Sequence, residues 1–353
     1  MKNDTFTQKN TLFSLQFFST IIALISLLLT ACSSTNPTSG SGPEKQTVGV
    51  VLDTGGENDK SFNEYTLRGT KEGAKAAGLN FFYLVSGTSS DYEKNIELQI
   101  SEGADLIITV GFLMGDATAA MAKKYPNVKF AIIDNIYLPD KDGLDPYTRD
   151  LKNVTSLTFA EDQVGYLAGV LAGCVSQTGK VATVSGMEIP PVKNFVTGFQ
   201  KGAKFANSKI VTFNQYIPDF NDPATGKTVG QNFINQGADV IFGVGGNTGN
   251  GGLLAAKEAG KKAIGVDVDQ YLTYPEIKDA LITSAIKKID VATKRAVKEF
   301  AEGKLKPGIE LATITNGGVG LAPYHDWENK IPQTCKDKVQ AAETAIKKLM
   351  ANG

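Results

Sequence analysis

From Thr47 onward, short β-branched runs alternate with longer amphipathic segments. Several of the short runs are continuously apolar, which is typical of parallel strands covered by helices on both faces. The amphipathic segments place their apolar residues on one stripe, and they include Glu161–Val175, Pro191–Asn207 and Ile289–Glu302. The expected strands are Thr47–Leu52, Asn80–Val85, Asp105–Val110, Val128–Asp134, Lys180–Val184, Ile210–Gln215, Asp239–Gly243 and Ala263–Val266. The alternation predicts an α/β fold with doubly wound parallel sheets.

The alternation occurs twice, and this predicts two lobes. One series ends near Asp134, and a second runs from about Lys180 to Asp267. We expect the chain to cross between lobes at Val154–Phe159, to return with Ala280–Ala285 and the helix at Ile289, and to cross again at Leu311–Ile314. The predicted N-terminal lobe is 47–156 and 285–306, and the predicted C-terminal lobe is 157–284 and 307–353. Several connections of this kind form a multi-strand hinge with a ligand cleft between the lobes.

The N-terminal segment has the features of an export signal. Lys2 and Lys9 precede the apolar run Ile21–Leu29, and small residues follow up to Cys32. Leu29–Cys32 resembles a bacterial lipobox, which implies a signal peptide at 1–31 and fatty acylation of Cys32, with palmitate among the acyl groups. The Ser/Thr/Gly/Pro-rich residues that follow predict a flexible tether at 32–46. The alternative is an uncleaved membrane helix with an incidental cysteine.

Two further cysteines, Cys174 and Cys335, have no partner that the sequence can assign. Outside the cytoplasm they could form a disulfide. Two separate buried thiols are the alternative, because the sequence does not give the distance between the two Cα atoms.

Composition excludes several classes of function. Lys and Arg number 36 against 37 Asp and Glu, so no basic excess indicates a nucleic-acid partner. The single histidine, His325, lies late in the chain, away from every expected strand-end loop, so a hydrolase triad, a metal site and a cofactor are not predicted. Residues Asn221–Thr228 imitate a phosphate-binding loop, but Asn221 replaces its first glycine and Pro223 removes a backbone donor.

Polar and aromatic residues follow the first expected strand. In parallel sheets, ligands bind at the carboxyl ends of the strands, and here the strand is followed by Asp53 and then by Phe62 and Asn63. Ser61 and Glu64 have the spacing of a capping box, which predicts that a helix begins here. These residues are candidates for a ligand site; the alternative is a Phe62 buried in the core and a solvated Asn63.

The motif Asp53–Gly56 followed by Asp59–Asn63 resembles the basic membrane protein family of lipoproteins, whose best understood members are PnrA-type purine nucleoside receptors. The resemblance extends in order over essentially the whole mature chain. Its further motifs are Gly111-Phe112, Ile132–Asp134, Phe159–Glu161, Gly165–Gly169, Gly186–Glu188, Phe195, Gly198-Phe199, Gly226-Lys227, Gly245-Gly246, Ile264–Asp267, Ser284 and Lys287. The family implies a fold similar to type I periplasmic binding proteins.

The resemblance also implies a set of ligand residues. Asp53 and Asn63 would bond the purine edge, and Phe62 and Phe220 would stack on the two faces of the base. The ribose would meet Asp134, Asp267, Gly245 and Lys287, with the carboxylates accepting from its hydroxyls. Phe195 and Phe199 are expected in the core, and Asp116 is expected as a helix cap or as a charge in the first turn of a helix. The loop Gly243–Gly252 has more Asn and Gly than the family pattern leads us to expect. The residue that takes the role assigned to Gly245 could therefore be displaced by one position.

The function that the resemblance implies is a substrate-binding lipoprotein of an ABC importer, on the extracytoplasmic side of the cell membrane. Its ligand would be adenosine, guanosine or inosine, and its partners would be a membrane permease and an ATPase. One alternative is a sugar receptor of the same fold. A nucleoside hydrolase that uses Asp53, Asp134 and Asp267 is the other, because those carboxylates are expected to converge.

Overall fold

The structure is a computed structural model that describes residues 45–137 and 151–351. The described residues belong to one compact unit. The expected signal peptide, nearly all of the expected tether and Cys32 lie outside the described residues. Within the described ranges, no helix has both the length and the apolar character needed to cross a bilayer.

The first sheet is entirely parallel, with strand order β2-β1-β3-β4-β5-β11. Its strands are β1 (Thr47–Leu52), β2 (Asn80–Val85), β3 (Leu106–Val110), β4 (Lys129–Ile133), β5 (Val154–Phe159) and β11 (Gly308–Ala312). The strands β1 and β3 are buried along their whole length, as their continuously apolar sequences predict.

The second sheet repeats this order as β7-β6-β8-β9-β10-β12. Its strands are β6 (Lys180–Ser185), β7 (Val211–Tyr216), β8 (Val240–Val244), β9 (Lys262–Asp267), β10 (Leu281–Lys287) and β12 (Val319–Leu321). All neighbours are parallel except β10 and β12, which pair antiparallel. Each expected strand is present, with its ends shifted by no more than about one residue.

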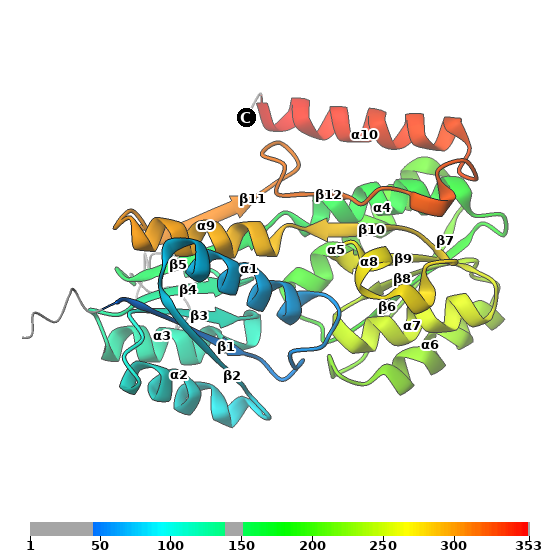
Figure 1. The fold of residues 1–353 in the computed structure, drawn as a ribbon. Coiled ribbons are helices and arrows are strands. Elements are labelled where there is room, and N and C mark those ends of the chain that lie inside the picture. The colour runs from blue at the N-terminus through cyan, green and yellow to red at the C-terminus, as the bar shows by residue number, and fades with distance from the viewer. Residues whose placement is uncertain (1–44, 138–150, 352–353) are drawn as a thin grey trace, which may run out of the picture. The chain divides into compact units, whose positions relative to one another are not determined.

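Helices cover both faces of each sheet (Figure 1). The long helices are α1 (Phe62–Ala77), α2 (Tyr92–Ser101), α3 (Gly115–Lys124), α4 (Glu161–Val175), α5 (Pro190–Ala206), α6 (Pro223–Asn235), α7 (Gly246–Glu258), α9 (Ile289–Ala301) and α10 (Gln333–Ala351); α8 (Gln270–Thr273) is a single turn. In the first lobe, Val50 packs in the core beneath α1 and α9, and its neighbour Val51 packs with Ile96 of α2 on the other face. In the second lobe, Phe242 packs with the α4–α5 side and Ile241 with the α6–α7 side.

The chain exchanges helices between the lobes. Helix α4 follows β5 of the first sheet but packs on α5, and α9 follows β10 of the second sheet but packs on α1. The strand β11 belongs to the first sheet, although residues 307–353 are expected in the C-terminal lobe. The expected boundaries at 156 and 285 likewise cut through β5 and β10. Periodicity identifies a strand but does not show which sheet it pairs with, and this accounts for the differences.

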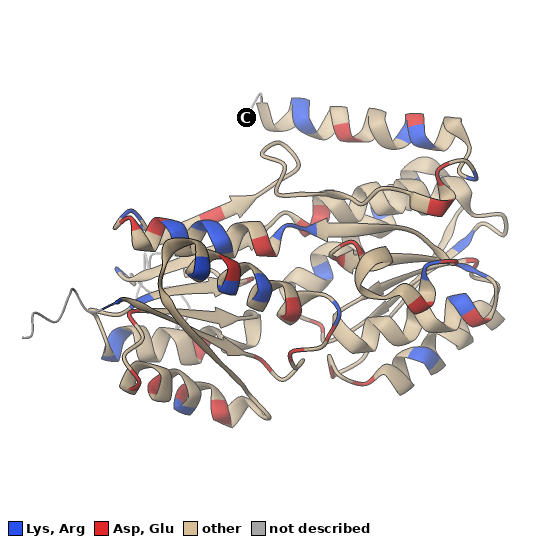
Figure 2. Cartoon of the chain, in the orientation of Figure 1, with Lys and Arg blue, Asp and Glu red and all other residues tan. Residues whose placement is uncertain are grey.

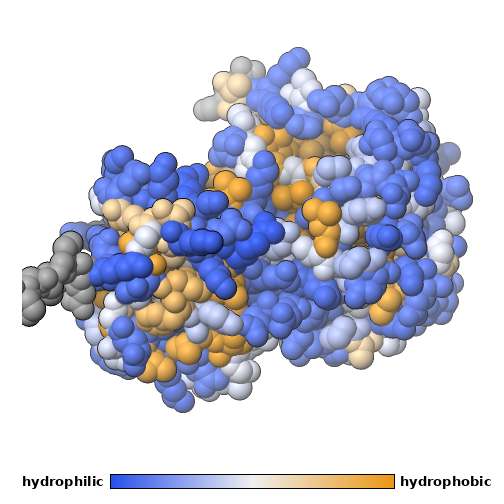
Figure 3. Space-filling view, viewed as in Figure 1, coloured by the Kyte–Doolittle hydropathy of each residue, from blue (hydrophilic) through white to orange (hydrophobic). Residues whose placement is uncertain are grey.

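The surface carries charges of both signs. Lys and Arg lie interspersed with Asp and Glu along α1, α9 and α10 (Figure 2). The face in Figure 3 is mostly hydrophilic, with apolar side chains mainly around β2, where Tyr83 and Val85 are exposed, and below α10. No broad field of one sign covers this face, so ligand recognition depends on local groups.

A disulfide joins Cys174, at the end of α4, to Cys335, at the start of α10, with Cα atoms 5.6 Å apart. This decides between the two alternatives for these cysteines. Helix α10 packs on α4 and buries Cys335, Val339 and Ala342. The disulfide therefore ties the C-terminal helix to the second lobe.

We predict that the double substitution Cys174→Ser/Cys335→Ser lowers the free energy of unfolding by roughly 2–5 kcal/mol, because the disulfide closes a long loop in the unfolded chain. The loop spans 161 residues. Thermal melting with and without a reducing agent measures the effect. Reductant should lower the melting temperature of the wild type and leave the variant unchanged. Equal melting of both proteins under oxidising conditions would contradict the pairing.

Candidate ligand-binding site

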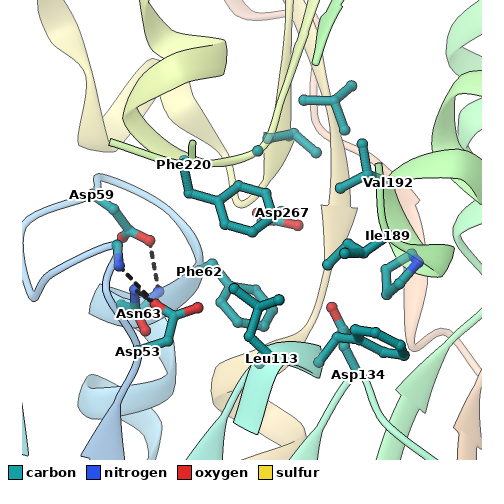
Figure 4. A pocket seen from close by; sticks show the side chains of 18 of the residues that line it. Asp53, Asp59, Phe62, Asn63, Leu113, Asp134, Ile189, Val192, Phe220 and Asp267 are labelled. Atoms are coloured by element: carbon teal, nitrogen blue, oxygen red, sulfur yellow. Dashed lines mark hydrogen bonds between the residues drawn. The ribbon is translucent and has the colours of Figure 1, made fainter. Parts of the chain in front are cut away.

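A cavity lies where the carboxyl ends of the two sheets face each other, and residues of both lobes line it (Figure 4). It encloses about 580 Å³ of space, part of it open to solvent. The structure brings together at this cavity all the ligand residues expected from the sequence: Asp53, Phe62, Asn63, Asp134, Phe220, Gly245, Asp267 and Lys287.

The loop between β1 and α1 places Asp53 beside Asn63. The Asp53 Oδ1 atom accepts hydrogen bonds from Asn63 Nδ2 (2.8 Å) and from the backbone N–H of Gly55 (2.9 Å). Asn63 is 2% exposed, and its Oδ1 atom accepts no hydrogen bond from any described residue. A carboxylate and an amide acceptor thus lie together at the cavity wall.

Helix α1 begins at Phe62 as predicted, but the expected capping box does not form. The Ser61 hydroxyl makes no capping hydrogen bond. Asp59 replaces it, because its two carboxylate oxygens accept from the backbone N–H groups of Ser61 (3.0 Å), Asn63 (2.8 Å) and Glu64 (3.2 Å). Asp59 therefore fixes the helix start that carries Phe62 and Asn63, and it also lines the cavity.

Two aromatic rings reach the cavity from opposite lobes. Phe62 comes from α1 and Phe220 from the loop before α6, and both rings point into the cavity (Figure 4). The backbone of Gly186 and Gly245 supports Phe220: a Cβ atom at these positions would lie 2.5 Å and 3.1 Å from its ring. Gly245 also has φ 103°, which other residues rarely adopt. Both Gly245 and its neighbour Gly246 line the cavity.

Asp134 and Asp267 occupy equivalent positions in the two lobes. Asp134 follows β4, and Asp267 ends β9, the corresponding strand of the second sheet. Both have left-handed backbone conformations, with φ 62° and 65°. Such conformations cost about 1–3 kcal/mol and are concentrated at functional sites. The Asp134 Oδ1 atom accepts no hydrogen bond from any described residue.

Lys287, the last residue of β10, connects these carboxylates. Its side chain is 2% exposed; the Nζ atom donates to Asp134 Oδ2 and lies 3.5 Å from Glu161 Oε1 and 3.9 Å from Asp267 Oδ1. The Nζ atom also lies 4.9 Å from the centroid of the Phe62 ring. Lys287 thus forms a buried ion pair between the lobes and offsets part of the negative charge of the site.

Burial raises the pKa of the site's carboxyl groups. Desolvation raises the pKa of Asp53 and of Asp134, although hydrogen bonds to Asp53 and the charge of Lys287 near Asp134 oppose it. It raises the pKa of Asp267 to about 6, of Asp59 to about 7 and of Glu161 to about 8. Burial lowers the pKa of Lys287, but Asp134, Glu161 and Asp267 raise it further, so it lies above its ordinary value.

Two charged groups of the site were not expected from the sequence. Asp59 lies inside a loop, where no periodicity distinguishes it from its neighbours. Glu161 is expected from the sequence as a helix start and as part of a family motif, without a role in the site, and it reaches Lys287 from the N-terminal turn of α4. The apolar wall of Leu113, Ile189 and Val192 was not expected either. All of these residues follow a strand end or lie in the first turn of the next helix, and this position is the sequence feature that could have identified them as site residues.

Of the other candidates, Phe195 lines the cavity, whereas Phe199 and Asp116 do not. Phe195 and Phe199 are buried as expected, although Phe195 also contributes to the cavity wall. Asp116 lies in the first turn of α3. In the loop that imitates a phosphate site, Asp222 caps α6 by accepting from Thr225 N (2.9 Å), so these residues form a helix start.

Contrary to the expectation from the sequence, His325 lies beside the segment that follows a strand end. Its Nε2 atom lies 2.7 Å from Asp269 Oδ2, and its ring stacks on Tyr271, just after β9. It does not line the cavity. No group of His, Cys, Asp and Glu residues within the described ranges has an arrangement suited to a metal ion.

Buried polar contacts also join the lobes outside the cavity wall. Asn250 Nδ2, on α7, donates to the backbone carbonyl of Asp59 (3.0 Å). The hydroxyl of Thr273, at the end of α8, donates to the carbonyl of Lys60 (2.7 Å). These bonds hold the β1–α1 loop against the second lobe.

Comparisons with known proteins give a consistent result. The family model described as "ABC transporter substrate-binding protein PnrA-like" matches residues 46–351. The chain is 34% identical over 348 residues to the "ABC transporter nucleoside-binding protein BmpA" of Lactococcus lactis subsp. cremoris, covering 92% of this chain and 94% of that protein. It is 33% identical over 288 residues to "Basic membrane protein A" of Borreliella burgdorferi, covering 81% and 79%.

A solved structure has a similar fold. It is an ABC transporter solute-binding protein from Aeropyrum pernix, with a TM-score of 0.77, 27% identity, and coverage of 86% of this chain and 91% of that one. The two parallel α/β sheets are therefore those of a solute-binding protein of the periplasmic-binding-protein type.

We predict that the ligand-free protein loses stability as the pH rises from about 4.5 to 8. Unfolded carboxyl groups ionise near pH 4, whereas Asp267, Asp59 and Glu161 hold their protons up to about 6, 7 and 8 in the folded state. The folded state therefore binds more protons in this window, and raising the pH favours unfolding. A difference of one in pKa corresponds to about 1.4 kcal/mol, so Glu161 alone should contribute a few kcal/mol to the loss.

Urea unfolding at a series of pH values measures this dependence. Glu161→Gln should flatten the curve between about pH 6 and 8, because glutamine does not titrate. Asp162→Asn is the matched control: this neighbouring residue also lies in the first turn of α4. Stability that rises with pH through this window would contradict the assignment of raised pKa values.

Proposed function

The chain belongs to the PnrA-like family of ABC transporter substrate-binding proteins, and on this basis we propose that it is a lipoprotein receptor that binds a purine nucleoside between its lobes. The observation that carries the proposal is the cavity, in which Phe62 and Phe220 project from opposite lobes beside buried carboxylates. A flat heterocycle with a polyhydroxylated substituent is complementary to such a site. The Lactococcus lactis relative, described as nucleoside-binding, supports the same ligand class.

The purine base is assigned to the space between the two rings. Stacking on an aromatic ring contributes about 1–3 kcal/mol per base and accepts any flat heterocycle. Asp53 and Asn63 then lie at the edge of the base, where the Asp53 carboxylate accepts from ring or amino N–H groups. The Asn63 amide adds a donor or an acceptor, according to its orientation.

The ribose is assigned to Asp134 and Asp267. A carboxylate has only acceptors, so each of the two can accept from the hydroxyl groups of a diol. Lys287 keeps these carboxylates together by neutralising part of their charge, and its ammonium group can donate to a ribose oxygen. The Gly245 backbone at the cavity wall permits a close approach of the sugar.

Capture follows from closure of the lobes. A ligand that contacts both lobes binds the closed state more tightly than the open state and so shifts the population toward it. The closed receptor then presents a defined surface to a membrane permease that a separate ATPase drives. The export signal and Cys32 support a location on the extracytoplasmic side, anchored through acyl chains.

We predict that titration calorimetry detects binding of inosine, guanosine or adenosine in preference to glucose, galactose or ribose. Phe62→Ala should weaken nucleoside binding by roughly 1–3 kcal/mol, or about 5–150-fold in Kd. Phe205→Ala is the matched control, because Phe205 is 63% exposed and does not line the cavity.

Preference for a sugar would instead support the alternative receptor. Recovery of intact nucleoside after incubation with the protein is expected for a receptor, and release of free base would indicate a hydrolase. If Phe62→Ala binds as tightly as the wild type, the assignment of the base to this cavity is wrong.

We also predict that the two lobe-end carboxylates distinguish ribose from deoxyribose. Asp134→Asn and Asp267→Asn should each weaken inosine binding by about 1.5–3 kcal/mol, the usual value of a hydrogen bond to a charged group. The wild type should bind inosine more tightly than 2′-deoxyinosine, and at least one variant should lose most of that difference. Calorimetry with both ligands on all three proteins checks this, and an unchanged difference in both variants would exclude the assignment.

A further inference from the structure

We propose that Asn250, Gln270 and Thr273 form an interlobe clasp that stabilises the closed state by gripping the carbonyls of Asp59 and Lys60. The proposal rests on the proposed closure around a ligand. The clasp residues act through the β1–α1 loop, and their side chains do not line the cavity. They are therefore positioning residues, which orient Phe62 and Asn63 only when the lobes meet.

The Asn250 arm of the clasp is a buried chain of hydrogen bonds. Asn250 is 5% exposed and Gln270 is fully buried. Gln270 Nε2 donates to Asn250 Oδ1 (2.8 Å), and Asn250 Nδ2 donates to the carbonyl of Asp59 (3.0 Å). Gln270 Oε1 accepts from the backbone N–H of Val266 (2.9 Å), next to Asp267. The orientation of the Asn250 amide is thereby fixed with its donor toward the first lobe.

The second arm comes from the single-turn helix α8. Thr273 donates from its hydroxyl to the Lys60 carbonyl (2.7 Å), and the Lys60 ammonium lies 5.7 Å from the centroid of the Tyr274 ring. Lys60 has φ 60°, an uncommon conformation for a residue with a side chain. Adjacent carbonyls of one loop are thus held by two different elements of the second lobe.

The clasp has a rigid base in the second lobe. The backbone N–H of Gln270 donates to Ser284 Oγ on β10 (3.1 Å). Asp269, which caps α8, accepts from Tyr271 N and contacts His325, whose ring stacks on Tyr271 with centroids 4.0 Å apart. A turn this short has little stability of its own, so these contacts position Thr273.

The loop held by the clasp is the β1–α1 loop, which carries the groups that the first lobe contributes to the binding site. Asp59 provides its carbonyl to Asn250 and, through its carboxylate, caps α1 at Ser61 and Asn63. Closure therefore fixes the start of α1 from the second lobe. Separation of the lobes exposes both carbonyls and both donors to water, so each bond adds a modest net stability to the closed state.

The expected effect is a loss of affinity that is the same for every ligand. Thr273→Val keeps the shape of the side chain and removes the donor, and we expect it to raise Kd about 3–10-fold. Asn250→Ala should raise Kd by a similar factor, because it removes the hydrogen bond to the Asp59 carbonyl, the other bond of the clasp between the lobes. Both changes should act mainly on the dissociation rate, since they destabilise the closed complex.

Stopped-flow binding and calorimetry of wild type and variants with inosine, guanosine and adenosine test the clasp. Thr228→Val is the matched control, because this exposed threonine of α6 donates only within its own helix, to the carbonyl of Ala224 (3.0 Å). Equal factors for all three ligands, with unchanged melting of ligand-free Thr273→Val, are expected. Wild-type affinity in both variants, or an altered order of ligand preference, would overturn the proposal.

Two further measurements separate this proposal from the proposed function. If the wild type binds a sugar and no nucleoside, the nucleoside assignment fails, and the same proteins are titrated with that sugar to test the clasp. Hydrogen exchange of the proteins saturated with the ligand that the wild type binds, nucleoside or sugar, reports on the closed state. Amides of residues 54–61 should exchange faster in both clasp variants than in the wild type and in Thr228→Val, and equal rates would exclude the clasp.

Discussion

The buried ammonium group of Lys287 is the contact on which the site depends. It has carboxylates of both lobes around it, and its hydrogen bond to Asp134 joins the second sheet to the first. A lysine this deeply buried needs such partners, because desolvation otherwise removes its charge. The converse also holds: without Lys287, Asp134 and Asp267 would repel each other across one cavity. Lys287 therefore both links the two lobes and reduces the negative charge of the site.

The two lobes repeat one design with different chemistry. The residues after corresponding strands share unusual backbone conformations: Asp134 matches Asp267, and Gly111 matches Gly245. After the first strand of each lobe, however, Asp53 is matched by Gly186, whose missing side chain makes room for the Phe220 ring. One lobe thus contributes a polar edge and the other an aromatic wall, so a site built from similar halves has a defined orientation for its ligand.

Much of this arrangement could be predicted from the sequence, for identifiable reasons. Continuous apolar runs located the strands, and the rule that ligands meet strand carboxyl ends brought Asp53, Asp134 and Asp267 to one place. Pairing between distant segments could not be predicted, so β11 was assigned to the wrong lobe and His325 was placed away from the residues after β9. Local spacing also gave a wrong prediction of a capping box at Ser61. The carboxylate of Asp59 accepts from the backbone N–H groups at the start of α1 in its place.

The exchange of helices between lobes has a consequence for the order in which the chain folds. The first lobe needs α9 to cover one face of its sheet and β11 to complete the edge, yet both follow the whole central part of the second lobe in sequence. During synthesis, the face that α9 covers stays partly exposed until Ile289–Ala301 has been made, and the edge of the sheet stays open until β11 has followed. The first lobe therefore cannot complete its fold from its N-terminal segments alone, and its last elements join it only after most of the second lobe has been made.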